Sequence, residues 1–132
     1  MIDFEDNVVD YLSRNLEKEF PNINVTSEFS INDESTFPTV LVYEMDNYTY
    51  TPTLDSSLRE NHARCVYQIE VYTKGNRSKS KAKKILSSID SLLELHGFIR
   101  QIKTRMETGY TDMTRYVARY QALISNDGLI YR

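Results

Sequence analysis

Two stretches of the chain repeat apolar residues at the spacing of an α-helix, which places them on one face. The first covers residues 3–20 and ends before Pro21, because proline disfavours helical geometry in the residue before it. The second follows a turn at Gly75-Asn76, and Gly97 is suited to end it in a left-handed conformation. The stripe of the second helix is formed by Ala82, Ile85, Leu86, Ile89, Leu92, Leu93 and His96.

Most of the remaining chain alternates apolar and polar positions, as β-strands do. The clearest strand covers residues 62–73, with Cys65, Tyr67, Ile69 and Val71 on one face. Further strands are expected at 23–29, 39–44, 98–108, 114–125 and 129–131. Because the strands cluster and only two helices accompany them, the pattern predicts one α+β domain. We expect a four- to five-stranded, mostly antiparallel sheet with both helices packed on one face.

The connection between the strands at 39–44 and 62–73 is longer than a tight hairpin needs. It contains Tyr48-Thr49-Tyr50-Thr51, whose aromatic and β-branched side chains are typical of a strand. Long loops in small domains tend to be functional, so we interpret the segment as an extended β-arm or long hairpin that contacts a neighbouring subunit or another partner chain. A strand extension that folds back on its own sheet is the alternative. The candidate interface residues are Tyr48, Tyr50, Thr51, Arg59 and Glu60.

The net charge of −3 is unevenly distributed along the chain. Residues 1–60 hold 13 Asp and Glu against 3 Lys and Arg, whereas residues 61–132 hold 6 against 13. Three interpretations are open. An acidic and a basic face of successive copies meet head to tail and close into a ring; the basic half faces nucleic acid; or the two halves interleave in the fold and the asymmetry averages out.

The start of the second helix is strongly basic. Cations at a helix N-terminus oppose the helix dipole, so an acidic partner or a phosphate backbone nearby would stabilise them. The alternative is a solvated helix start, since water and salt screen exposed charges. We call this group the lysine cluster; it consists of Lys74, Arg77, Lys79, Lys81, Lys83 and Lys84.

The sequence has no pattern typical of catalysis or of a cofactor site. The four glycines are scattered singly, so none forms a phosphate-binding loop. His62 and His96 lack the spacing of metal ligands, and Cys65, the single cysteine, lies in mid-strand, where a thiol is a small apolar group. We therefore expect a protein that is not an enzyme, that holds no cofactor or metal, and that does not enter a membrane.

Several short motifs follow one another along most of residues 1–132. They are Phe37-Pro38-Thr39-Val40, Asp46-Asn47-Tyr48-Thr49-Tyr50, Glu60-Asn61-His62-Ala63, Tyr67-Gln68-Ile69-Glu70-Val71-Tyr72, Gly97-Phe98, Arg115-Tyr116-Val117-Ala118-Arg119-Tyr120 and Ile130-Tyr131-Arg132. In this order they resemble the tail completion, or tail terminator, proteins of long-tailed bacteriophages, which include minor capsid proteins of Gram-positive phages. The resemblance implies one domain over residues 1–132, similar to the lambda tail terminator.

The resemblance further implies a structural virion protein, assembled in the host bacterial cytoplasm. Such proteins form a homo-oligomer, a hexameric ring, at the head-proximal end of the tail. The ring binds the tail tube protein, ends tube polymerisation and offers a surface to head-completion or connector proteins, while genome DNA only passes through its lumen. A head-tail joining protein and a small nucleic-acid-binding module are the alternatives.

Replacing Tyr48 and Tyr50 together with serine tests the predicted arm. We expect a folded monomer with weakened assembly, because aromatic side chains at an interface contribute much of its binding energy. Circular dichroism reports folding and analytical ultracentrifugation reports assembly. A variant that unfolds would indicate that the segment belongs to the sheet instead.

Overall fold

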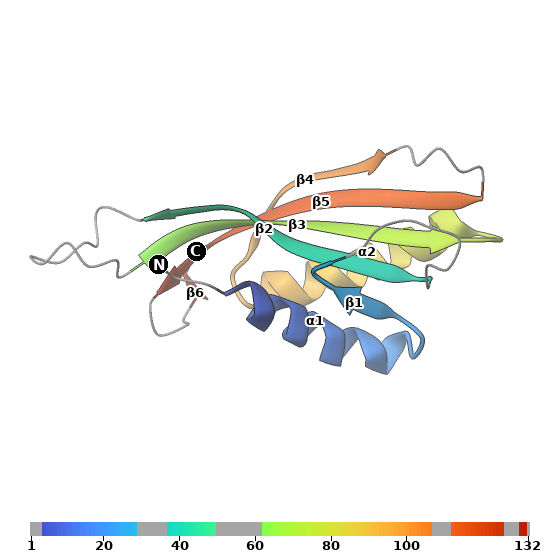
Figure 1. Ribbon diagram of the computed structural model, residues 1–132, viewed down its shortest axis with the longest axis horizontal. Helices are drawn as coiled ribbons and strands as arrows, with labels where there is room; N and C mark the ends of the chain where they lie inside the picture. Colours follow the sequence, from blue (N-terminus) through green and yellow to red (C-terminus); the bar gives the residue numbers. More distant parts are fainter. Residues whose placement is uncertain (1–3, 29–36, 50–61, 107–111, 126–129, 132) are drawn as a thin grey trace, which may run out of the picture.

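The computed structural model of the chain describes residues 4–28, 37–49, 62–106, 112–125 and 130–131. Two helices pack on a mixed sheet in a single small α+β domain, as predicted (Figure 1). The elements are α1 (Glu5–Glu19), β1 (Asn24–Thr26), β2 (Thr39–Thr49), β3 (His62–Lys74), α2 (Ser78–Leu95), β4 (Ile99–Met106), β5 (Met113–Ser125) and β6 (Ile130–Tyr131).

The strands lie in the order β1-β2-β3-β5-β4, and the short β6 pairs with the end of β5. β1 is parallel to β2, and the other pairs are antiparallel. At the centre of the sheet, β3 and β5 pair along 13 positions without a register shift, from His62 opposite Ser125 to Lys74 opposite Met113. The other strands and both helices pack around this uninterrupted central pair of strands.

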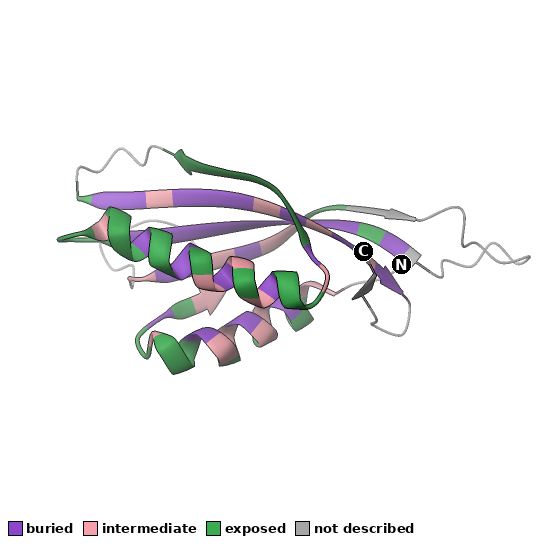
Figure 2. Cartoon of the chain, turned by 180° about the vertical axis from the view of Figure 1, so that it is seen from behind, coloured by how far each residue is buried: buried purple, intermediate pink, exposed green. Residues whose placement is uncertain are grey.

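Both helices lie on the same face of the sheet, α1 against β1 and β2 and α2 against β3 and β5 (Figures 1 and 2). Most of the predicted stripe of α2 is buried, as Figure 2 shows: Ala82, Ile85, Leu86, Ile89 and Leu93 are at most 1% exposed. Leu92 is only half-buried, and His96, at the end of the helix, is exposed. The four residues predicted on one face of β3 are fully buried against the helices. We call the opposite side, which no described helix covers, the helix-free face.

Hydrogen bonds tie α1 to the rest of the domain. Tyr11 donates its hydroxyl to the Leu92 carbonyl of α2 at 3.1 Å, and the Glu44 amide of β2 donates to the Glu5 carboxylate at 2.8 Å. The buried side chains of α1 recur at i+4, at Val8, Leu12 and Leu16, as the sequence predicts. The apolar contacts and these polar links hold α1 over the β1–β2 side.

Left-handed residues set the two ends of α2. Gly75 and Arg77 have φ of +93° and +58° and turn the chain out of β3 into the helix. At the other end Gly97, with φ of +90°, occupies the position expected for it, because glycine adopts this region without steric cost. The sequence therefore located both turns correctly.

Strand β2 is longer than the predicted 39–44 and runs to Thr49. A bulge at Met45 shifts the pairing register between Glu44 and Asp46, so the alternation that marks the first half of the strand is interrupted there. Beyond the bulge the backbone of Tyr48 pairs with Arg64. The first half of the Tyr/Thr segment is thus part of the sheet, while residues 50–61, and with them the predicted long hairpin, lie outside the described residues.

A matched pair of Ile→Ala variants tests where the core lies. Ile69 is fully buried in β3, whereas Ile102 of β4 is 41% exposed. Ile69→Ala is expected to lower the free energy of unfolding by about 2–5 kcal/mol, because it leaves a cavity between sheet and helices. Ile102→Ala is expected to cost less than about 1 kcal/mol. Urea denaturation followed by circular dichroism measures both, and equal losses would contradict the described packing.

Candidate functional site

β4 is an edge strand on which all eight residues are exposed. Among the described strands it pairs with β5 alone, and α2 packs mainly over β3 and β5, with fewer contacts to β4. The sequence marks Phe98, Ile99, Ile102 and Met106 as the apolar set of this strand; Phe98 is buried, but the other three are 45%, 41% and 42% exposed. Exposed apolar side chains along an unpaired edge are typical of a surface that binds another chain. We call this surface, Ile99–Met106, the β4 edge.

The two sides of β4 differ in chemistry. Residues that pair across an antiparallel ladder share a face of the sheet. Ile102 and Met106 pair with arginines of β5 and therefore belong to the helix-free face, whereas Lys103 and Arg105 pair with positions that face the helices. A partner that approaches the β4 edge meets apolar side chains on one side and positive charges on the other.

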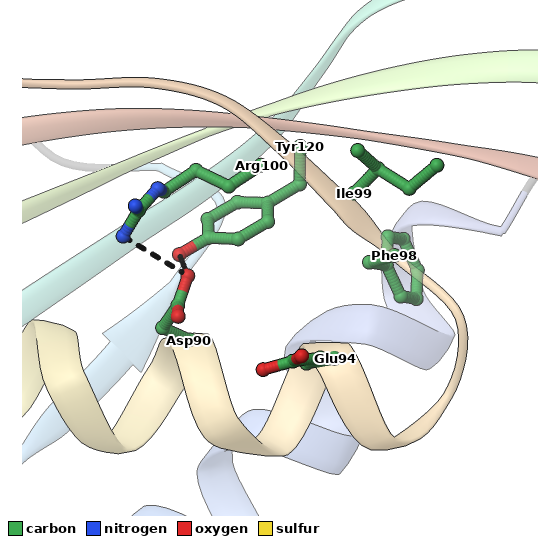
Figure 3. Close-up of a pocket in the computed structure, with 6 residues that line it drawn as sticks. All are labelled: Asp90, Glu94, Phe98, Ile99, Arg100 and Tyr120. Carbon is green, nitrogen blue, oxygen red and sulfur yellow. Dashed lines mark hydrogen bonds and ion pairs between the residues drawn. The ribbon is translucent and has the colours of Figure 1, made fainter.

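At the start of β4 the edge adjoins a cavity of about 500 Å³ between α2 and the sheet (Figure 3). The Asp90 carboxylate of α2 accepts a hydrogen bond from the Tyr120 hydroxyl at 2.8 Å. It also forms an ion pair with the guanidinium of Arg100 at 3.4 Å. Burial and the neighbouring Asp90 raise the pKa of Tyr120, so its hydroxyl stays protonated and donating at neutral pH. The cavity is lined by Asp90, Glu94, Phe98, Ile99, Arg100 and Tyr120.

A polar cluster, the Glu70 network, lies on the helix-free face. Glu70 is only 3% exposed, although no described helix covers it. Its carboxylate accepts hydrogen bonds from Tyr43 at 3.0 Å, Gln68 at 3.1 Å, Tyr72 at 2.9 Å and the Arg115 Nε at 2.6 Å, and it also forms an ion pair with the Arg115 guanidinium. The network joins β2, β3 and β5 through one buried charge.

The surroundings of Glu70 keep it ionised. Burial opposes the charged form most strongly, but the hydrogen bonds from Tyr72, Arg115 and Gln68 together outweigh burial and lower the pKa of Glu70 below its ordinary value of 4.5. Burial and the bond to Glu70 raise the pKa of Tyr72 to about 12, so this hydroxyl remains a donor. Hydrogen bonds to the ionised Glu70 therefore link three strands, and the hydroxyl of Tyr72 stays protonated.

The lysine cluster lies at the end of β3 and the start of α2, where all six of its side chains are exposed. The first turn of α2 contains no acidic residue, and no side chain caps its N-terminus. The backbone there is held instead by Thr73, which donates to the Ser78 carbonyl at 2.5 Å, and by a 2.8 Å hydrogen bond between the hydroxyls of Ser78 and Thr114. The predicted contact of this cluster with a partner or with DNA stays a prediction.

Of the predicted interface residues, the structure places one. The backbone of Tyr48 lies in β2, next to β3. Tyr50, Thr51, Arg59 and Glu60 lie outside the described residues. The predicted contacts of these five side chains therefore stay predictions.

The described part of the chain shows no metal-binding cluster: nowhere in it do three or more His, Cys, Asp or Glu side chains gather closely enough to hold an ion. None of its helices is long and apolar enough to cross a membrane. Cys65 is buried in the core, as expected for a thiol that packs as a small apolar group.

Sequence reasoning missed the Glu70 network and the exposure of the β4 edge. Glu70 and Arg115 each lie in a predicted strand and in one of the motifs of the resemblance, but the sequence predicted no contact between them. Their contact depends on which strands are neighbours, and local alternation does not specify this. Likewise, the apolar residues of β4 have the spacing of core residues. Their exposure follows from the position of α2, which lies mainly over β3 and β5.

No protein-family model matches this sequence, and a search of curated proteins found no match.

Glu70→Gln tests the network. At pH 7 we expect the free energy of unfolding to fall by roughly 1–3 kcal/mol, because Arg115 loses its buried charged acceptor. Since the pKa of Glu70 is lowered on folding, its ionised form stabilises the protein above about pH 4.5. That stability is lost as pH falls through the lower folded-state pKa, so the difference between variant and wild type should shrink in acid.

Urea denaturation at pH 7 and at pH 3 measures this difference. Glu28→Gln is the matched control, because Glu28 is exposed on the β1 side of the domain. A Glu70 variant that is as stable as the control at pH 7 would contradict the role assigned to the network.

Proposed function

We propose that the protein is a structural subunit of a long-tailed phage that forms a ring at the head-proximal end of the tail tube. In this role it ends polymerisation of the tube and offers a surface to head-completion proteins. Genome DNA passes through the ring without being recognised by sequence. The proposal unites the motif resemblance with the properties of the β4 edge.

The β4 edge is the observation that carries the proposal. A monomer rarely leaves an eight-residue edge strand with three large exposed apolar side chains, because such an edge promotes association. A subunit of a ring covers that surface with its neighbour. The exposed apolar residues of β4 therefore support a protein that works by assembly with other chains.

The α+β architecture agrees with the small α/β protomer that the resemblance implies. Both helices lie on one sheet face, so the domain has two distinct faces and two distinct lateral sides. A ring subunit needs such differences, because its contacts with the tube, the head and its neighbours are unlike one another.

A small nucleic-acid-binding module is the second candidate, and the exposed lysine cluster favours it. When lysines of a protein neutralise DNA phosphates, the affinity of that protein for DNA falls steeply as the salt concentration rises. The net charge of −3 and the acidic first half of the chain weigh against it. Measurable affinity of the purified protein for DNA, with a steep salt slope, would favour this module over the ring.

The ring is tested by the mass of the purified protein and by tail-tube length in a phage that lacks the gene. Wild-type protein is expected to assemble, alone or on tubes, and to restore tubes of uniform length. Ile102→Gln combined with Met106→Gln should assemble at least about tenfold more weakly, because its apolar contact area is reduced. Leu95→Gln is the control, since Leu95 is 80% exposed at the end of α2.

Two results would contradict the proposal. Uniform tubes in the absence of the protein would exclude a role in ending polymerisation. A double variant of β4 that assembles as well as Leu95→Gln would show that this edge is not the contact. Binding to tailless heads in preference to tubes would point to a head-tail joining protein instead.

A further inference from the structure

Acidic and basic residues lie on opposite sides of the domain. The first half of the chain supplies α1, β1 and β2, which form one side, and the second half supplies α2, β5 and β4, which form the other. In Figure 1, α1 runs along the lower margin and β4 along the upper margin. Among the described residues, the two halves of the sequence therefore lie on different sides of the domain, and their charge asymmetry persists in space.

Among the described residues, acidic side chains predominate in the first half of the sequence and basic side chains in the second half. Those between 4 and 49 include eight Asp or Glu and two Lys or Arg, whereas those between 62 and 125 include four and twelve. On α1 four acidic residues are exposed, against two basic ones, Arg14 and Lys18; the acidic residues are Asp6, Asp10, Glu17 and Glu19. We call α1 with these side chains the α1 flank. On the opposite side, the exposed basic residues of the β4 edge are Arg100, Lys103 and Arg105.

Arg100 is already paired with Asp90 at 3.4 Å, so Lys103 and Arg105 are the charges that the β4 edge presents to a partner. They belong to the helix side of β4, whereas the exposed Ile102 and Met106 belong to its helix-free face. A binding surface of this kind fits a partner that is acidic and that also covers apolar side chains. The α1 flank of the same protein is acidic, and it lies on the far side of the molecule.

We propose that the β4 edge of one copy docks on the α1 flank of a second copy. The contact joins two different surfaces on opposite sides of the chain, so it repeats from subunit to subunit and closes into a ring when the rotation allows. Opposite charges fix the direction of each contact and disfavour the pairing of like edges. This inference rests on the proposed ring and names the two surfaces that form it.

Charge reversal on each surface tests the pairing. One variant carries Lys103→Glu with Arg105→Glu, and the other carries Asp10→Lys with Glu17→Lys. Each should assemble at least about 100-fold more weakly than wild type, because like charges then face each other at every contact. An equimolar mixture should recover assembly, since the acidic β4 edge of the first meets the basic flank of the second, and the unchanged surfaces also match.

The readout is sedimentation velocity, on the protein alone and with purified tail tubes, at two salt concentrations. Wild-type assembly should weaken as salt rises, because the screening length falls from about 10 Å at 0.1 M to about 3 Å at 1 M. Lys81→Glu with Lys84→Glu is the matched control. Lys84 lies one turn before Ser88, which donates to Glu19 of α1, so this pair lies on the α1 side of α2 and controls for charge reversal away from the β4 edge.

The outcomes separate the contact from the proposed function. Variants that assemble like the control, or a mixture of two folded variants that stays dissociated, would overturn the contact. If the β4 variant still assembled with itself but no longer bound tubes, while the α1 variant bound them, the β4 edge would contact an acidic surface of the tube. That result would also overturn the proposed contact between copies. A wild type that is monomeric alone and on tubes would overturn both proposals. Recovery in the mixture without any effect on tube length would support the contact and reject the tail role.

Discussion

The uninterrupted pairing of β3 with β5 is the constraint on which the rest of the structure depends. It places Tyr67 opposite Tyr120 and Ile69 opposite Ala118 on the helix side, where α2 buries them. The same register brings Arg115 close to Glu70 on the other side. A shift of one residue would exchange the two faces of a strand, so the hydrophobic core and the Glu70 network specify the same register.

The Glu70 network shows that the helix-free face is structurally defined. A buried carboxylate costs free energy unless its charge is matched and its lone pairs are occupied, and here four side chains supply the donors. Such a network is sensitive to geometry, because a displaced strand would leave a buried charge without its partners. It therefore adds specificity of strand pairing to the stability that comes from the apolar core.

The sequence was sufficient for the elements whose pattern is local. The alternation in β3, the stripe of α2 and the glycine at the end of that helix all follow from side-chain spacing and backbone preference. The length of β2 did not, because the bulge at Met45 interrupts the alternation within a continuous strand. The exposed β4 edge and the Glu70–Arg115 pair depend on which elements become neighbours, and distant pairing leaves no local signal.

The sheet has unequal edges, since β1 contributes three residues and β4 contributes eight. Among the described residues, the opposite edge consists of the three residues of β1 and, past them, of the bulged part of β2 that β1 does not pair, so it is not one continuous strand. Continuous backbone hydrogen bonding from copy to copy is therefore disfavoured, and with it the open-ended growth that produces amyloid-like fibres. The short β1 and the bulge in β2 thus limit the length over which two copies could pair strand to strand.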